Sequence, residues 1–134
     1  MRTVICLLAF IIFNCAPEKK KAERNDKPSP DGSKIVTTKH ENGKTRAEIP
    51  YKDGKQHGIS RSFDRNGDVI LELPYVDGKR EGLSKKYFAG GKKLYQTTEY
   101  KNDKLHGLQT KFRENGRVLS EARYENDFPC LGLK

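Results

Sequence analysis

Few residues in this sequence have the types and spacing that metal binding or catalysis would need. Asp64-Arg-Asn66-Gly-Asp68 begins with the spacing of a calcium loop. Val69 and Tyr75, however, stand where that loop needs glycine and glutamate, so a hairpin turn is the preferred interpretation. The sequence has no zinc-protease, nucleophile-elbow, Cys-x-x-Cys or phosphate-loop motif. We therefore expect no catalytic residue, no metal site and no cofactor.

Two histidines share one position of an internal repeat. His57 and His106 occupy it in two copies, and Glu81 stands there in another. Because the position recurs in a turn and accepts a carboxylate, we interpret these side chains as solvated or locally hydrogen-bonded turn residues rather than metal ligands.

The chain begins with a short apolar segment. Val4 to Phe13 is an uninterrupted apolar run behind a positive start. A run of about ten residues is too short for a membrane-spanning helix, which needs roughly 20. Its length is typical of the hydrophobic region of a signal peptide.

The run ends close to Cys15, so the segment resembles a bacterial lipoprotein signal. In such signals the cysteine is lipidated and becomes the first residue of the mature chain. Ile12 fits the aliphatic position, whereas Asn14 is larger than the small residue usual before the cysteine. We expect a signal peptide over residues 1–14 and a membrane anchor on Cys15. An ordinary signal peptide or an uncleaved anchor is the alternative.

Residues 15–33 are expected to form the lipidated start of the mature chain and a flexible tether. From residue 16 on, the segment has no aliphatic or aromatic residue larger than alanine and proline, so it cannot bury enough apolar surface to fold. A flexible chain of this length reaches about 25 Å. After removal of the signal, Cys130 would be the one unmodified thiol. It can form no internal disulfide, and we interpret it as a partly buried apolar residue.

The composition is that of one small basic domain. The 134 residues include 27 Lys plus Arg against 18 Asp plus Glu, for a formal charge of +9. The charge alone is compatible with nucleic-acid binding. An exported lipoprotein would rarely meet nucleic acid, and the cations are scattered. We therefore expect anionic lipid headgroups, lipopolysaccharide phosphates or an acidic protein as counter-charges. A purely solubilising surface is an equal alternative.

An internal repeat of 24 or 25 residues fills the rest of the chain. The run Tyr-x-x-Gly-Lys-x-x-Gly starts at Tyr51 and Tyr75, and at Tyr100 with Asp103 in place of the first glycine. An aromatic residue follows each tyrosine twelve positions later, and a glycine sixteen positions later. A half repeat from Glu41 precedes these copies, and a degenerate half closes the chain.

Turn dipeptides punctuate the repeat. Asn42-Gly43, Asn66-Gly67 and Asn115-Gly116 favour two-residue type I′ turns, and Asp53-Gly54 and its equivalents mark a second set. Between turns, apolar and polar residues alternate with period two, which predicts antiparallel strands, eight in all. The one extra residue after Gly90-Gly91 is expected to form a bulge or a longer turn.

These residues resemble the MORN-type repeat in its bacterial variant form. The resemblance covers residues 41–132 as three full copies and two halves. It implies an all-β fold, an elongated antiparallel meander of stacked β-hairpins, over residues 34–134. Asp103 and Phe128-Pro129 depart from the repeat pattern, which indicates a worn or capping terminal copy.

Alternation predicts one aromatic face on this sheet. We expect it to carry the seven repeat aromatics, as a candidate interaction face: Tyr51, Phe63, Tyr75, Tyr87, Tyr100, Phe112 and Tyr124. The opposite face is expected to be polar, with Arg46, Glu48, Ser60, Ser62, Glu72, Lys86, Lys111, Glu121 and Arg123. A single layer cannot cover its own apolar face, so the sheet should curl, form a homodimer or hold a partner. Aromatics that fill the groove of a curled sheet are the preferred interpretation, and a dedicated ligand stripe is the alternative.

The sequence predicts an exported, membrane-anchored lipoprotein whose repeat domain is a non-enzymatic binding or scaffold module. The absence of Asp after Cys15 is, by resemblance to sorting signals, compatible with the outer membrane of the bacterial cell envelope. Proteins with such repeats are also described as antitoxin components, so an antitoxin-like protein that neutralises a toxic partner is the alternative. A signal peptide argues against a cytoplasmic toxin as that partner.

Overall fold

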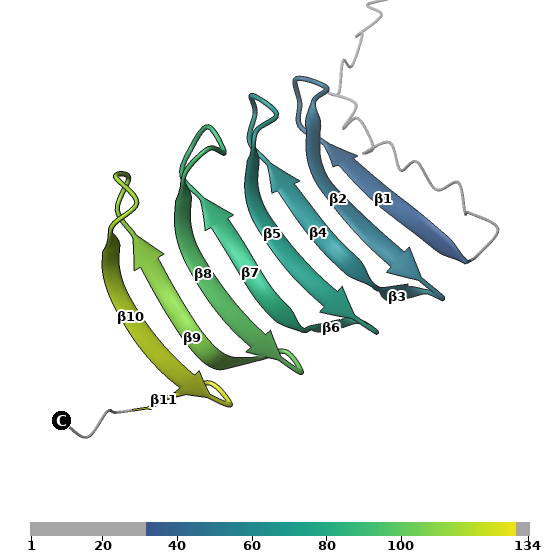
Figure 1. Cartoon of the computed structure of the whole chain (residues 1–134). Coiled ribbons are helices and arrows are strands. Elements are labelled where there is room, and N and C mark those ends of the chain that lie inside the picture. Colours follow the sequence, from purple (N-terminus) through teal and green to yellow (C-terminus); the bar gives the residue numbers. More distant parts are fainter. Residues whose placement is uncertain (1–31, 131–134) are drawn as a thin grey trace, which may run out of the picture.

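The computed structural model describes residues 32–130. The expected signal peptide, Cys15 and nearly all of the tether lie outside these residues, so those predictions remain untested. The described part is one antiparallel sheet of eleven strands (Figure 1). The strands are β1 (Ser33–Lys39), β2 (Thr45–Lys52), β3 (Lys55–Gln56), β4 (Gly58–Phe63), β5 (Val69–Val76), β6 (Lys79–Arg80), β7 (Gly82–Tyr87), β8 (Leu94–Lys101), β9 (Lys104–Phe112), β10 (Val118–Glu125) and β11 (Phe128–Pro129).

Strands that follow one another in the chain also lie side by side. The order in the sheet is β1-β2-β4-β5-β7-β8-β9-β10-β11, with β3 paired to β2 and β6 paired to β5. In two hairpins the second strand is interrupted: the two-residue strand β3 precedes β4, and β6 precedes β7. In the equivalent place further along the chain, β9 is one uninterrupted strand. The meander of hairpins and its eight long strands confirm the fold expected from the repeat.

Hairpins at one end of the sheet close with two-residue turns. Asp53 and Gly54 both have positive φ (51° and 78°) between the paired residues Lys52 and Lys55. Positive φ at both central positions is the signature of a type I′ turn, whose twist matches that of the flanking strands. Asn102 and Asp103 adopt the same pair of positive φ angles without a glycine (50° and 70°).

Hairpins at the other end have three-residue loops, so the expected type I′ geometry of the Asn-Gly dipeptides is wrong. Gly43 N–H donates to the carbonyl of His40 (3.0 Å), and His40 N–H donates to the carbonyl of Lys44 (2.8 Å). Gly43 has a φ of 82°, and Asn42 is not among the positive-φ residues. This is a type I turn followed by a left-handed glycine. The Asn42 side chain stabilises it by accepting the N–H of Lys44 (3.1 Å).

The loop after β7 contains the extra residue. Phe88 N–H donates to the carbonyl of Lys93, five residues on, whereas Asp64 N–H donates to Asp68, four residues on. Both Gly90 and Gly91 have positive φ. The expected longer turn after Gly90-Gly91 is therefore confirmed.

A bulge follows each of these loops and sets which face a side chain occupies. In β5, Phe63 pairs with Val69 and Ser62 pairs with Leu71, which leaves Ile70 as the extra residue. The same shift lies between Lys86 and Tyr87 in the β7–β8 pair. One inserted residue exchanges the two faces for everything beyond it, because side chains alternate with period two.

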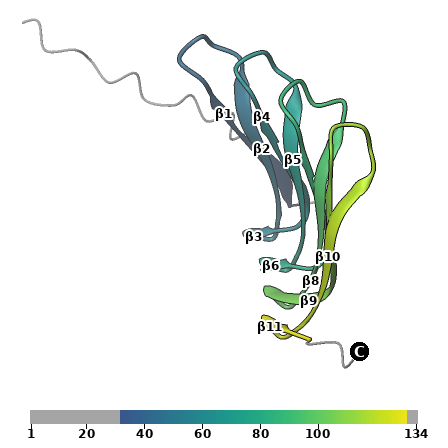
Figure 2. The same cartoon turned by 90° about the vertical axis from the view of Figure 1, so that its left-hand side faces the viewer.

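The sheet is a single bent layer (Figure 2). No apolar side chain among residues 32–130 is buried, and the buried residues are Ser84, Thr98 and Thr110. Stability must therefore come from strand pairing and contacts between neighbouring repeats rather than from a central core.

Candidate ligand-binding face

Four tyrosines form a row on one face of the sheet. The partners across the strands are Gly58 for Tyr75, Gly82 for Tyr100 and Gly107 for Tyr124. A glycine opposite each of these rings leaves the space that a side chain would fill. We call the side of the sheet that carries Tyr51, Tyr75, Tyr100 and Tyr124 the tyrosine face.

The other three predicted aromatics lie on the opposite face. Phe63, Tyr87 and Phe112 directly follow Ser62, Lys86 and Lys111 along their strands, and those three residues share the tyrosine face by pairing. The single aromatic face expected from alternation is thus divided in two. The bulges after the three-residue loops cause this, because they shift the register by one residue between the aromatic and the tyrosine of the next strand.

The polar set predicted for the opposite face is divided as well. Ser60 and Ser62 pair with Leu73 and Leu71, which places both serines on the tyrosine face. Lys86 and Lys111 lie there too, whereas Glu48, Glu72, Glu121 and Arg123 do occupy the opposite face, and Arg46 is the extra residue of a bulge. We call the opposite side the glutamate face.

Tyr87 has a defined partner on the glutamate face. Its hydroxyl donates to Glu72 Oε2 (2.9 Å), and Arg61 Nε lies 3.3 Å from Glu72 Oε1. Burial, and then the hydrogen bond to Glu72, raise the pKa of Tyr87 above its usual value. These three side chains join β4, β5 and β7, so Tyr87 couples two repeats rather than extending the row of tyrosines.

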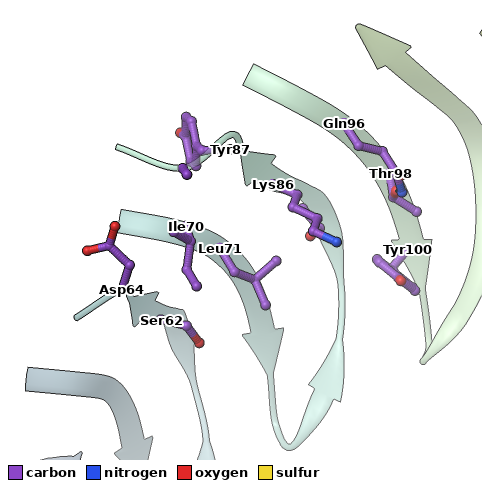
Figure 3. A pocket seen from close by; sticks show the side chains of 11 residues that line it. Ser62, Asp64, Ile70, Leu71, Lys86, Tyr87, Gln96, Thr98 and Tyr100 are labelled. Atoms are coloured by element: carbon purple, nitrogen blue, oxygen red, sulfur yellow. The ribbon is translucent and has the colours of Figure 1, made fainter. Parts of the chain in front are cut away.

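The tyrosine face is hollowed over its middle repeats. The hollow has a volume of about 690 Å³, and Figure 3 shows side chains of β5, β7 and β8 around it. It is lined by Ser62, Asp64, Ile70, Leu71, Ser84, Lys86, Ala89, Gln96, Thr98 and Tyr100, and at its loop end by Tyr87, whose hydroxyl bonds to Glu72 on the glutamate face. Two buried hydroxyls are hydrogen-bonded here: Ser84 Oγ donates to the carbonyl of Glu72, and Gln96 Nε2 donates to Thr98 Oγ1. Hydroxyl, amide and aromatic groups thus meet in one place.

Asp64 at the rim of this hollow serves its own turn. Its Oδ1 accepts the N–H groups of Asn66 (2.8 Å) and Asp68 (2.9 Å). Hydrogen bonds from backbone amides, chiefly that of Asp68, lower the pKa of the Asp64 carboxyl. The hairpin interpretation of the calcium-like segment is confirmed. Among residues 32–130 no group of three His, Cys, Asp or Glu could hold a metal ion.

Cations accompany the tyrosines. The Arg80 guanidinium lies 4.5 Å from the centre of the Tyr100 ring, and Lys34 Nζ lies 5.7 Å from that of Tyr51. Such cation–π contacts hold the charge beside the ring and keep it on this face. Burial raises the pKa of Tyr75, one of the two inner tyrosines of the row.

At two turns an aspartate stands where the repeat pattern has glycine, and each aspartate bonds to the preceding repeat. Asp103 Oδ1 accepts the backbone N–H of Arg80 (2.9 Å) in the preceding repeat, and Asp127 Oδ1 accepts that of Leu105 (2.8 Å). A glycine at these positions could not form the bond. The bond from Arg80 N–H is the main cause that lowers the pKa of Asp103. Each aspartate therefore connects its hairpin to the previous one.

The remaining candidate residues lie apart from the hollow. His57 Nδ1 is 3.5 Å from Asp77 Oδ1 in the next repeat. Cys130 is exposed, which corrects the expected partial burial, because it follows β11 at the edge of the sheet. No helix among residues 32–130 has the length and apolar character needed to cross a membrane.

A scan against family models finds the MORN repeat variant at residues 34–53, 56–77, 80–102 and 105–126. The chain belongs to the MORN repeat variant family. Each matched MORN repeat contains one long hairpin: β1–β2, β4–β5, β7–β8 and β9–β10. The first matched repeat begins at residue 34 and so includes strand β1. The copies counted from the tyrosines, with a half repeat from Glu41, did not include this strand. No curated protein and no solved structure matches the chain.

MORN repeats are in general binding or scaffold modules, and this agrees with the open architecture of the sheet. Sequence reasoning missed Ser84, Lys86, Gln96 and Thr98 as lining residues of the hollow. The signal that could have found them is the extra residue after two of the loops, Ile70 and Tyr95. Each stands next to another apolar residue and so breaks the alternation of apolar and polar residues.

Proposed function

We propose that this protein is an exported, lipid-anchored binding module of the bacterial envelope that acts without catalysis. Cys15 carries the lipid, residues 15–33 form the tether, and the MORN repeats present a binding face to a partner in the envelope. The observation that carries the binding role is the single-layer sheet, which has no buried apolar side chain among residues 32–130 and a hollow on one face. A layer that buries so little of its own surface is suited to presenting that surface to another molecule.

The lipid anchor rests on the sequence of residues 1–15. It predicts that Cys15→Ser moves the full chain from the detergent phase to the aqueous phase and abolishes palmitate labelling. Unchanged partitioning of the Cys15→Ser variant would refute the anchor and the location that depends on it. Cys130→Ser is the matched control, because it removes an exposed thiol outside the signal and should leave partitioning as it is.

The binding role is tested on the tyrosine face. Tyr75→Ala combined with Tyr100→Ala should weaken capture of the partner from envelope extracts while the circular dichroism spectrum remains that of a β-sheet. Loss of the sheet itself would mean that the tyrosines act in folding and would count against the proposal. Phe63→Ala is the control on the glutamate face.

A further inference from the structure

Charge is sorted between the two faces of the sheet. Among the strand residues that pair on the tyrosine face, four are cationic and none is a carboxylate: Lys34, Arg80, Lys86 and Lys111. The five strand glutamates all pair on the other face: Glu48, Glu72, Glu99, Glu121 and Glu125. The glutamate face carries strand cations too, among them Arg61, Lys85 and Arg123, so the two faces differ in their carboxylates: the cations of the tyrosine face have no strand carboxylate on their own face.

Three of the four cations of this face have no ion pair within the described chain, whereas Arg80 Nε lies 3.3 Å from Asp103 Oδ1. No carboxylate of residues 32–130 forms an ion pair with Lys34, Lys86 or Lys111. Lys86 pairs with Gln96, and Gln96 pairs with Lys111, so the two lysines lie two strands apart in one row. Two strand spacings correspond to about 10 Å. An anionic ligand would supply the missing counter-charges.

The tyrosines repeat at the spacing that separates Lys86 from Lys111. Tyr75 and Tyr100 occupy equivalent positions two long strands apart, and so do Tyr100 and Tyr124, again about 10 Å between rows. Between the tyrosine row and the lysine row lie small hydroxyl side chains, of which Ser84 and Thr98 are buried, hydrogen-bonded and part of the lining of the hollow. The face therefore offers one tyrosine and neutral polar groups in each repeat, and a lysine in the first, third and fourth repeats: Lys34, Lys86 and Lys111.

We propose that the tyrosine face binds an extended anionic polysaccharide that runs across the strands and carries one carboxylate per disaccharide. In an extended β-linked glycan, alternate sugars present the same side, and one disaccharide spans close to the distance between two tyrosine rows. The apolar side of every second sugar packs on a tyrosine, and its hydroxyls bond to the serine, threonine and glutamine side chains. In the repeats that carry a lysine on this face, the carboxylate lies near that lysine. This inference rests on the proposed role as a binding module and names the ligand class.

The spacing favours a glycan over the other anionic polymers. A peptide strand rises about 3.4 Å per residue, so its acidic side chains on one side repeat roughly every 7 Å. Single-stranded nucleic acid stacks successive bases on aromatic rings, which requires aromatic groups closer together than one per repeat. A ligand with one flat apolar surface and one charge every 10 Å or so fits the observed period.

The test is a titration of the full chain with end-labelled hyaluronan oligosaccharides, followed by fluorescence anisotropy. Hyaluronan carries one carboxylate per disaccharide and is the probe, whatever glycan the envelope supplies. Four tyrosine rows predict that affinity rises with length up to the octasaccharide and then levels off. Chitin oligosaccharides, which have no carboxylate, should bind about tenfold more weakly.

Two neighbouring lysines provide the matched variants. Lys86→Gln removes a cation from the tyrosine face and should weaken octasaccharide binding about fivefold, as expected for one partly exposed charge contact. Lys85→Gln removes the same charge from the glutamate face, where Lys85 lies opposite Glu72 in the β5–β7 strand register. It should change affinity by less than about twofold. Thermal unfolding of both variants checks that the sheet is intact.

Several results would overturn the inference. These are equal losses for Lys85→Gln and Lys86→Gln, tighter binding of oligothymidine or polyglutamate of equal charge, the absence of any length dependence, and a dimer that buries the tyrosines in sedimentation experiments. The titration does not involve Cys15. A failure here with detergent partitioning intact would remove the glycan and leave the lipid-anchored module, whereas the opposite result would remove the anchor alone.

Discussion

The hydrogen bond between Tyr87 and Glu72 makes a sharp test of how two repeats are held together. Tyr87→Phe removes one hydroxyl that donates to Glu72 Oε2 at 2.9 Å and leaves the ring in place. Hydrogen bonds to charged groups contribute about 1.5–3 kcal/mol. The Glu72 side chain is 23% exposed and keeps Arg61 as a second partner, so we expect a loss of about 1 kcal/mol, somewhat below that range. For a domain of this size that corresponds to a fall in melting temperature of about 5 °C.

The assay is urea unfolding followed by circular dichroism, with the slope m compared between variants. Tyr124→Phe is the control, because the Tyr124 hydroxyl has no hydrogen-bond partner within residues 32–130. A double-mutant cycle with Glu72→Gln isolates the pair. A loss for Tyr87→Phe no larger than that for Tyr124→Phe, or a coupling near zero, would refute the reasoning that this bond connects the repeats.

Three further predictions concern pH and backbone geometry. Because the pKa of Tyr87 is raised in the folded state, its stabilising effect should be present below about pH 10 and lost as pH rises through the folded pKa. The difference in unfolding free energy between the wild type and Tyr87→Phe should therefore shrink above about pH 10. A difference that stays constant with pH would contradict this prediction. Because the Arg80 N–H lowers the pKa of Asp103, the stability of the fold should fall as pH drops from about 4 through the folded pKa. In melting experiments, Asp103→Asn should make the melting temperature depend less on pH in this acidic range. An unchanged pH dependence would count against the bond. Gly82→Ala places a side chain at a φ of +104°, where Pro74 Cγ lies 3.5 Å from the new Cβ, and should cost about 2 kcal/mol in urea unfolding, whereas Gly116→Asn, at a φ of +81° with open space, should cost well under 1 kcal/mol.

The hairpin repeat could be predicted from sequence because its signals are local. Turn dipeptides and period-two alternation appear at fixed distances from Tyr51, Tyr75 and Tyr100, and each is a property of a few neighbouring residues. Those signals place the strands and their order correctly. They also exclude the calcium-like interpretation of Asp64, whose carboxylate serves its own turn.

The assignment of faces could not be predicted in the same way. It depends on whether the Asn-Gly loops have two or three residues and on the extra residue that follows, such as Ile70. A single-residue difference moves Phe63 and Tyr87 to the other side of the sheet, although the alternation within each strand is unchanged. The connection between Asp103 and Arg80 was hidden for a related reason, since a lost glycine looks like decay until its partner 23 residues away is known.

The central claim is that the tyrosine face is the surface that meets a partner in the envelope. Hydroxyl-radical footprinting of the full chain, purified and in intact envelopes, measures this directly, with Leu83 on the glutamate face as the reference. We predict that oxidation of Tyr75 and Tyr100 falls in the envelope relative to the purified protein while that of Leu83 is unchanged. Equal oxidation of the tyrosines in both preparations, or protection of Leu83 instead, would contradict the account.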